Sequence, residues 1–259
     1  MTRPIHPPTV FLTGASSGLG EAVARHYAGK GAILGLVARR QAELDRVAAS
    51  LGPATVATYA ADVRDASAMT AAGRDFVARH GVPDIVIANA GVSRGTLAEH
   101  AEDLAAFREV FDTNVLGIVH TFHPFLAPMR EAKRGTLVGI ASVAGFRGLP
   151  GAAAYSASKA AAMTLLESLR VELRGSGVSV VTIAPGYVAT PMTERNPYRM
   201  PFLMDPKRAA ASMARAIARR KRFHVMPWPM GLVGRALRLL PRSVYDAAFA
   251  KAPRKPRHP

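Results

Sequence analysis

Residues 9–20 read Thr-Val-Phe-Leu-Thr-Gly-Ala-Ser-Ser-Gly-Leu-Gly. The apolar start predicts a short buried strand over 9–13, and the apolar spacing that follows predicts a helix over 18–29. The three glycines at the junction follow a Gly-x-x-x-Gly-x-Gly pattern. Glycine lets the backbone approach a pyrophosphate closely, and the free N–H groups of a helix start can bind it. The stretch therefore predicts a dinucleotide-binding loop, with an ordinary turn as the alternative.

Strand-like and helix-like segments alternate along the next two hundred or so residues. Further strands are expected at 32–38, 54–60, 84–88, 135–141, 178–184 and 223–226. Further helices are expected at 41–51, 66–79, 102–130, 154–174 and 206–220. This alternation predicts an α/β fold of the doubly wound type, a parallel sheet with helices on both faces. Ligands bind such folds at the carboxyl ends of the strands, near the point where the strand order reverses.

The composition limits the possible classes of protein. The 259 residues are 49% apolar and 20% charged, which fits one α/β domain with a full core, or such a domain with an appendage. No run of 18 apolar residues predicts a membrane-spanning helix, and the N-terminus carries no apolar signal core. The chain has no cysteine, which excludes disulfides and thiolate catalysis. A cytoplasmic enzyme is expected.

The end of the second predicted strand carries Arg39 and Arg40 and no acidic residue. An acid at this point would bind the 2′-hydroxyl of an adenosine ribose, whereas an arginine accommodates a 2′-phosphate. The sequence therefore favours NADP over NAD as cofactor, with NAD still possible. The alternative is that both arginines are solvated side chains at the end of a strand.

Tyr155 and Lys159 lie four residues apart in Ala-Tyr-Ser-Ala-Ser-Lys, and Ser142 precedes the tyrosine by thirteen residues. Positions i and i+4 share one face of a helix. A nearby ammonium favours the tyrosinate and lowers the pKa of tyrosine toward the range useful for acid–base catalysis. Ser142 could then hold a substrate oxygen beside the phenol. The alternative is a coincidental spacing in an alanine-rich helix.

Two more groups of turn residues follow predicted strands. Asp62-Val63 follows the third strand and Asn89-Ala90-Gly91 follows the fourth. Both groups lie where a bound dinucleotide would pass.

Taken together, these motifs resemble the classical short-chain dehydrogenase/reductase (SDR) family. The resemblance runs from about residue 9 to residue 190, in the family's order, and includes Asn114 and Pro185-Gly186. It implies a Rossmann-type fold with about seven parallel strands, and hydride transfer between a nicotinamide cofactor and a carbonyl or alcohol. Such enzymes often form dimers or tetramers, so a homo-oligomer is expected.

The resemblance also assigns roles to individual residues. Tyr155 would be the general acid/base, Lys159 would lower its pKa and hold the nicotinamide ribose, and Ser142 would orient the substrate oxygen. Asn114 would hold a water that links Lys159 to solvent. The complete set of expected cofactor contacts is Thr13, Gly14, Ser16, Ser17, Gly18, Leu19, Gly20, Arg39, Arg40, Asp62, Val63, Asn89, Ala90, Gly91, Tyr155, Lys159, Pro185, Gly186, Val188 and Thr190.

The segment near 187–207 is expected to form a substrate lid. It is rich in methionine and aromatic residues, and such a surface adapts to irregular apolar shapes. The residues concerned are Met192, Tyr198, Met200, Phe202, Leu203 and Met204. An apolar carbonyl substrate is one interpretation, and packing of the lid on the body is the other. The histidines show no metal-ligand spacing, so no metal site is expected.

The C-terminal part is strongly basic. Residues 207–259 contain 14 Lys and Arg and one acid, Asp246, out of a net charge of +16 for the chain. We expect residues 1–227 to form the catalytic domain and residues 228–259 a basic, amphipathic appendage, with apolar residues at 232, 233, 236, 237 and 240 and the arginines on a different side. The appendage could lie on an anionic membrane, contact a partner subunit or pack on the body.

Two other classes of protein remain as alternatives to an oxidoreductase. One is a regulatory protein that binds NADP without turnover, against which the complete catalytic set argues. The other is a nucleic-acid-associated protein, suggested by the basic C-terminal part. That part lacks interleaved aromatic residues, and no recognisable nucleic-acid motif occurs, so no nucleic-acid partner is expected.

Overall fold

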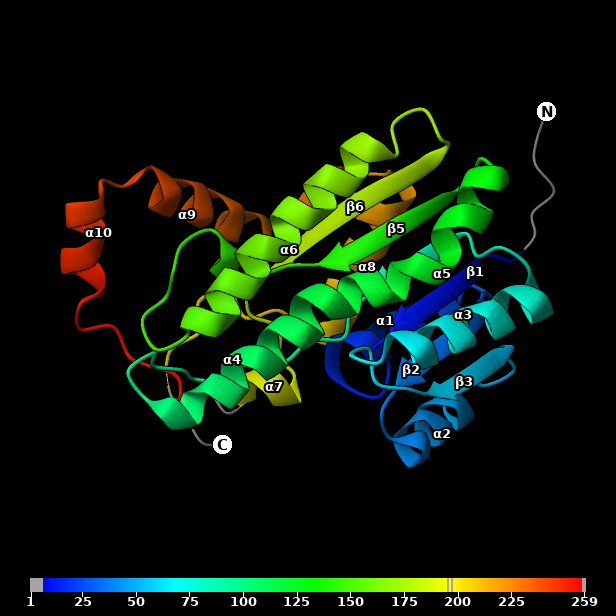
Figure 1. The fold of residues 1–259 in the computed structure, drawn as a ribbon, viewed down its shortest axis with the longest axis horizontal. Coiled ribbons are helices and arrows are strands. Elements are labelled where there is room, and N and C mark those ends of the chain that lie inside the picture. Colours follow the sequence, from blue (N-terminus) through cyan, green and yellow to red (C-terminus); the bar gives the residue numbers. More distant parts are fainter. Residues whose placement is uncertain (1–6, 195, 197, 258–259) are drawn as a thin grey trace.

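The computed structural model describes residues 7–194, 196 and 198–257, and these form an α/β fold around one parallel sheet (Figure 1). Within the described residues the sheet has seven strands in the order β3-β2-β1-β4-β5-β6-β7, and every neighbouring pair is parallel. The strands are β1 (Thr9–Thr13), β2 (Ile33–Ala38), β3 (Val56–Ala60), β4 (Ile85–Ala88), β5 (Gly135–Ile140), β6 (Val178–Pro185) and β7 (Phe223–Met226). The strand order reverses between β1 and β4, so a ligand crevice is expected there.

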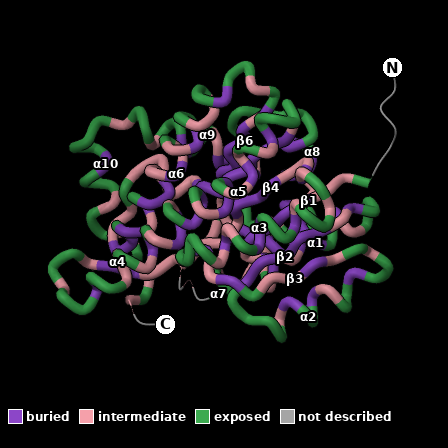
Figure 2. The backbone as a smooth tube through the Cα atoms, turned by 45° about the vertical axis from the view of Figure 1, so that its right-hand side comes forward, coloured by how far each residue is buried: buried purple, intermediate pink, exposed green. Residues whose placement is uncertain are grey.

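Successive residues of a strand point to opposite sides of the sheet. Both faces therefore carry apolar side chains, and helices cover both. Val10 and Leu12 pack in a core with helices α1, α2 and α8, whereas Phe11 packs in a second core with α3, α5 and α6. Figure 2 shows the buried residues gathered along the strands between these two layers. The helices are α1 (Gly18–Ala28), α2 (Gln41–Ala49), α3 (Ala66–His80), α4 (Leu104–Phe111), α5 (Gly117–Glu131), α6 (Ala153–Glu172), α7 (Pro191–Glu194), α8 (Pro206–Ala218), α9 (Trp228–Leu239) and α10 (Arg242–Phe249).

The predicted fold class is confirmed, and all seven predicted strands fall within two residues of their observed bounds at both ends. The long helix expected over 102–130 is interrupted. A π-helical turn, Asp112–Leu116, separates α4 from α5 and a single 3₁₀ turn precedes α4. Such π-turns often occur at functional sites, and this one contains Asn114.

The C-terminal helices lie at one end of the molecule (Figure 1). α9 packs beside β7, where Gly231 lies against Val225, and beside the turn after β5, where Gly234 lies against Phe146. α10 and the residues after it then return toward the loop that precedes α4. The predicted division of the chain at residue 227 stays a prediction. Among the described residues, no helix is both long enough and apolar enough to span a membrane.

Candidate active site

The glycine loop between β1 and α1 is shaped by close backbone contacts. Gly14 has a φ of 67°, in the left-handed region that favours glycine. At Gly20 a Cβ atom would collide with the carbonyl oxygen of Gly14 and lie 2.7 Å from the side-chain nitrogen of Asn89. The loop therefore leaves its backbone open toward the cleft, with the N-terminus of α1 behind it. Such a cradle fits a pyrophosphate.

Thr13 and Asn89 attach this loop to the end of β4. The Thr13 hydroxyl accepts hydrogen bonds from the backbone N–H of Asn89 (3.1 Å) and of Ala90 (3.2 Å). The Asn89 side chain donates to the carbonyl oxygens of Thr13 (3.0 Å) and Gly14 (3.2 Å). Thr13 is fully buried. It lies beneath the cleft, and its observed contacts position the loop.

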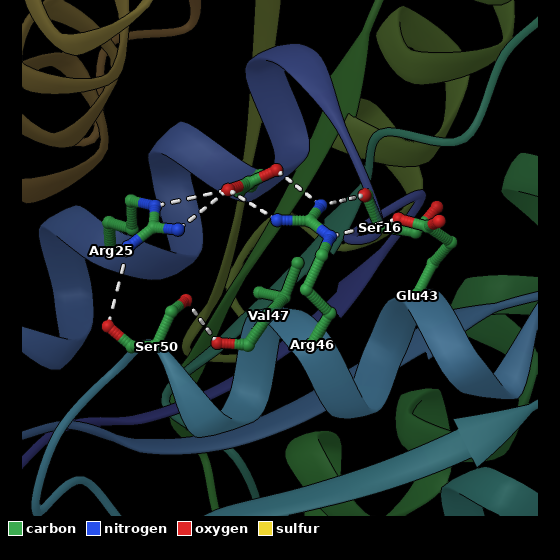
Figure 3. Close-up of polar contacts among 7 residues, drawn as sticks. Ser16, Arg25, Glu43, Arg46, Val47 and Ser50 are labelled. Carbon is green, nitrogen blue, oxygen red and sulfur yellow. Dashed lines mark hydrogen bonds and ion pairs between the residues drawn. The ribbon is translucent and has the colours of Figure 1, made fainter.

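Arg46 holds the same loop from the outside (Figure 3). Its guanidinium donates to the carbonyl oxygen of Ser16 at 3.2 Å and pairs with Glu21 (3.0 Å) and Glu43 (3.0 Å). Burial by itself would raise the pKa of the Glu21 carboxyl. Hydrogen bonds and charge interactions with Arg46 and Arg25 outweigh burial, so this pKa is lowered overall. Arg46 could not be recognised from the sequence, because nothing local marks a residue on α2 as a partner of the loop after β1.

Arg39 and Arg40 lie at the carboxyl end of β2, and both side chains are exposed at the cleft. Asp62, after β3, lies in the same wall and pairs with Arg64 at 2.6 Å. The Arg64 hydrogen bond holds the pKa of the Asp62 carboxyl below its ordinary value. Among the described residues, neither Arg39 nor Arg40 at this end of the cleft forms a salt bridge with a carboxylate.

Ser142 and Tyr155 meet at the other end of the cleft. Ser142 follows β5, accepts a hydrogen bond from the Ala144 N–H (3.2 Å) and donates to the Pro185 carbonyl (3.4 Å). Tyr155 lies in the first turn of α6. Burial raises the pKa of the Tyr155 phenol, and a hydrogen bond with Ser142 opposes this rise.

Lys159 lies one helical turn after Tyr155 on α6 and is only 4% exposed. Its Nζ donates a hydrogen bond of 2.8 Å to the Ile140 carbonyl oxygen. Burial lowers the pKa of Lys159 to about 8. A buried ammonium therefore lies beside a half-buried phenol, at the carboxyl end of β5.

Asn114 is fully buried in the π-turn. Its side chain accepts from the Val92 N–H (2.9 Å) and donates to the Val92 carbonyl (2.9 Å) and the Ser158 hydroxyl (3.0 Å). These bonds connect the loop after β4 to α6. Asn114 itself does not line the cleft, but its side-chain oxygen would lie 3.1 Å from a Cβ built on Gly91, a residue that does.

One cleft brings most of the predicted residues together. It runs from the glycine loop to α6, and Thr13 and Asn114 are the two predicted residues outside its lining. The predicted residues that line it are Gly14, Ser16, Ser17, Gly18, Leu19, Gly20, Arg39, Arg40, Asp62, Val63, Asn89, Ala90, Gly91, Ser142, Tyr155, Lys159, Pro185, Gly186, Val188 and Thr190.

Further lining residues belong to strand ends and to α7. Pro191 and Thr193 lie in α7 beside the expected lid residue Met192. The Thr193 hydroxyl donates to the Val188 carbonyl at 2.6 Å, and Val188 is paired with Met204 across the segment. Pro191 and Thr193 were not predicted as cleft residues. α7 is too short to show periodicity, so their position next to Thr190 in the sequence was the only available signal.

Comparisons with known proteins agree with this geometry. The sequence profile described as short chain dehydrogenase matches residues 8–199. An uncharacterized oxidoreductase of Myxococcus xanthus is 42% identical over 242 residues, which are 93% of this chain and 95% of that protein. The 11-beta-hydroxysteroid dehydrogenase 1A of Arabidopsis thaliana is 35% identical over 193 residues, or 73% of this chain, but this chain spans only 55% of that relative.

A solved structure shows the same fold. The alcohol dehydrogenase of Thermococcus sibiricus, complexed with 5-hydroxy-NADP, has a TM-score of 0.75 and 26% identity, and the alignment covers 85% of this chain and 94% of that one. The profile covers well over half of the chain, and the seven-stranded parallel sheet is the one that the resemblance implied. The chain belongs to the short-chain dehydrogenase/reductase family and is an NAD(P)-dependent oxidoreductase that acts on the CH–OH/C=O couple.

Proposed function

We propose that this enzyme transfers hydride between NADP and an apolar carbonyl/alcohol pair. One observation carries the proposal. A single cleft has Arg39 and Arg40 at one end and Ser142, Tyr155 and Lys159 at the other, with the glycine loop between them. This order suits a dinucleotide whose adenosine lies beside the arginines and whose nicotinamide lies beside the phenol.

In this proposal the cofactor supplies or accepts the hydride, and the protein handles the proton. In the reductive direction the Tyr155 phenol donates its proton to the substrate oxygen as the carbonyl carbon gains hydride, and in the oxidative direction the phenolate takes the proton back. Ser142 donates a hydrogen bond to the same oxygen. The Lys159 ammonium stabilises the phenolate. Asn114 positions α6 against the loop after β4; the water predicted between Asn114 and Lys159 stays a prediction.

The proposed preference for NADP depends on the end of β2. A guanidinium forms charge-assisted, often bidentate hydrogen bonds with a phosphate, and both Arg39 and Arg40 are exposed at the cleft. The structural relative from Thermococcus sibiricus, solved with 5-hydroxy-NADP, supports the same choice.

The proposed apolar substrate depends on the lid segment over 187–207. Met192 lines the cleft and is 41% exposed, while Phe202 (54%) and Leu203 (48%) are also exposed. Apolar side chains that remain exposed in the free protein are free to contact an apolar substrate. The Arabidopsis relative, named a hydroxysteroid dehydrogenase, supports a substrate of this class.

The proposal is tested with a panel of carbonyl compounds and alcohols that spans apolar and polar members. NADPH consumption and NADP⁺ reduction are followed at 340 nm, with NADH and NAD⁺ in parallel. We expect turnover with apolar members and NADP(H). Turnover confined to polar sugars would contradict the apolar substrate, and no turnover in spite of tight NADPH binding would favour a sensor that binds without reaction.

We further propose a homo-oligomeric enzyme. Apolar side chains are exposed along α4, the π-turn and α5: Leu104 (62%), Phe111 (37%), Leu116 (48%) and Val119 (40%). A partner copy that packs on this face would remove them from water. Light scattering after size-exclusion chromatography measures the mass, and a monomer at micromolar concentration would contradict this part of the proposal.

We also propose a cytoplasmic enzyme with peripheral contact to anionic membranes. On α9, Met230 and Gly234 face the body, whereas Trp228 (74% exposed), Leu232 (56%) and Leu239 (83%) face water. Their spacing of four and seven residues places them on one helix face, with Arg235 among them. The arginines were expected on a different side from the apolar residues, but Arg235 lies on the same helix face as the exposed Trp228, Leu232 and Leu239. This mixture of apolar and cationic groups fits the interface of an anionic bilayer.

A further inference from the structure

The C-terminal residues 242–257, here called the strap, make specific contacts with two loops beyond the sheet. One loop, residues 91–103, follows β4, and the other, residues 141–152, follows β5. Both loops leave the carboxyl edge of the sheet, the edge at which substrates bind in this class of fold. Figure 1 shows the chain returning from α10 along this end of the molecule to the loop before α4.

The strap first contacts the loop after β5. The Tyr245 hydroxyl donates to the Gly148 carbonyl oxygen at 2.7 Å, and Tyr245 is only 7% exposed. The Arg147 guanidinium lies over the Tyr245 ring, 4.2 Å from its centroid, and donates to the Leu240 carbonyl at 3.4 Å. Further on, Arg254 lies so close to Gly151 that a Cβ at Gly151 would be 2.8 Å from the Arg254 Cβ.

The end of the strap contacts the loop after β4 through charged groups. Lys255 donates to the Ser93 hydroxyl at 2.8 Å. The Arg257 guanidinium donates to Asp103 at 2.9 Å and to Glu102 at 2.8 Å. Asp103 is only 2% exposed, and its carboxylate also accepts the Leu97 N–H at 2.8 Å. A carboxylate shielded from water in this way depends on its cationic partner.

The two loops are joined to each other and to the reacting end of the cleft by buried Thr96. Its backbone N–H donates to the Gly151 carbonyl at 3.0 Å. Its hydroxyl accepts the Ala154 N–H at 3.2 Å, in the first turn of α6. Tyr155 is the next residue. The strap is therefore connected to the position of the phenol through Asp103, Leu97 and Thr96.

We propose that the strap holds the substrate-side loops in their binding conformation, and that Arg257 and Asp103 are positioning residues for substrate recognition. Binding is stronger when the groups that contact a ligand are ordered beforehand. None of the strap residues lines the cofactor cleft. Loss of the Arg257–Asp103 pair should therefore weaken substrate binding and leave cofactor binding unchanged. The kinetic part of this inference rests on the proposed function; the structural part does not.

The structural part is tested by hydrogen–deuterium exchange of the full-length chain. We expect Arg257→Gln and Asp103→Asn each to increase exchange at 93–103 and 146–151, while the sheet and the glycine loop stay protected. Arg257→Lys keeps the charge and should retain most of the protection. Arg235→Glu, an exposed arginine of α9 outside the strap, is the matched control and should change neither loop. Unchanged exchange in both Arg257→Gln and Asp103→Asn overturns the proposal.

The kinetic part uses the same variants with a substrate from the panel. We expect Arg257→Gln to raise KM about 10-fold, up to about 100-fold, since small misplacements remote from the chemistry can have effects of this size. The turnover number and the NADPH Kd from calorimetry should change little. Because the two residues act through one contact, Arg257→Gln should add little in the Asp103→Asn background. A loss of NADPH affinity parallel to the rise in KM would indicate general destabilisation and overturn the positioning role.

The two proposals fail in distinguishable ways. If the wild type binds no NADPH, the proposed function is contradicted and the exchange experiment still decides whether the strap orders the loops. If NADPH binds and the panel reacts while KM is unchanged in Arg257→Gln, the proposed function stands and the role of the strap in recognition is overturned.

Discussion

The ammonium nitrogen of Lys159 lies 5.8 Å from the centroid of the Tyr155 ring, and it donates its hydrogen bond to the Ile140 carbonyl. The sequence predicts that this lysine lowers the pKa of the tyrosine. Burial raises the pKa of the phenol and outweighs its hydrogen bond with Ser142, and the predicted effect of Lys159 on this pKa stays a prediction. The Tyr155 phenol, whose pKa burial raises, therefore lies beside an amine whose own pKa burial lowers to about 8.

Tyr155→Phe keeps the ring and removes the proton. We expect turnover to fall by about 10²–10⁴-fold, the usual range for a positioned acid or base. NADPH affinity, measured by calorimetry, should stay within about twofold because the ring still fills its place. Unchanged turnover would contradict the assignment of Tyr155 as the acid/base.

Lys159 should make the free energy of unfolding depend on pH in the alkaline range. Between its lowered pKa of about 8 and its ordinary 10.5, the unfolded chain binds more protons at this position than the folded chain. Stability from this group therefore rises with pH across that window. Relative to Lys159→Met, the free energy of unfolding should gain up to about 3 kcal/mol, since one pKa unit corresponds to about 1.4 kcal/mol. Urea titrations of both proteins from pH 7.5 to 10.5 measure the difference, and a pH-independent difference would show that burial does not perturb this lysine.

Replacement of Arg39 and Arg40 by alanine should change the choice of cofactor. The 2′-phosphate of NADPH would lose charge-assisted hydrogen bonds, which contribute about 1.5–3 kcal/mol each. We expect NADPH affinity to fall at least about 10-fold and NADH affinity to change little. Calorimetry with both cofactors measures this. The control is Arg64→Ala, whose guanidinium pairs with Asp62 and should influence both cofactors alike. Equal affinity of the wild type for NADPH and NADH would refute the NADP preference.

The exposed face of α9 should bind anionic vesicles. Each basic residue near an anionic bilayer contributes about 1 kcal/mol, screened within a Debye length of about 8 Å at physiological salt. The protein should sediment with vesicles that contain phosphatidylserine and be released by high salt. Leu232→Glu combined with Leu239→Glu should abolish binding, whereas Val171→Glu, an equally exposed change on α6, should not. If the wild type does not bind anionic vesicles at low salt, the membrane proposal is contradicted.

Most of the sheet and the cleft could be predicted from the sequence, because their signals are local. Strands β1 to β6 and their helices follow from apolar runs and helical spacing within windows of a few residues. The glycine loop and the Tyr155–Lys159 spacing are likewise local, and the order of parallel strands places their carboxyl ends together. The π-turn at Asn114 was missed, since a helix and a helix with one extra residue per turn share nearly the same local pattern.

The C-terminal part shows where local reasoning stops. The sequence reveals a high positive charge after residue 206 and suggests an anionic partner. The structure places one of those cations, Arg257, on the chain's own Asp103, 154 residues away in sequence. It also decides which face of α9 meets water, because Met230 and Gly234 are buried against the body whereas Trp228 stays 74% exposed.

The sequence by itself determined the fold class, the family and most of the residues that line the cleft, because short-range periodicity and motif spacing encode them. Only the tertiary structure decided the direction of the Tyr155 pKa shift, the role of Thr13 beneath the loop and the pairing of Arg257 with Asp103. Each of these depends on burial and on contacts between distant segments. Desolvation and charge pairing are properties of the packed chain, and neighbouring residues in the sequence do not specify them.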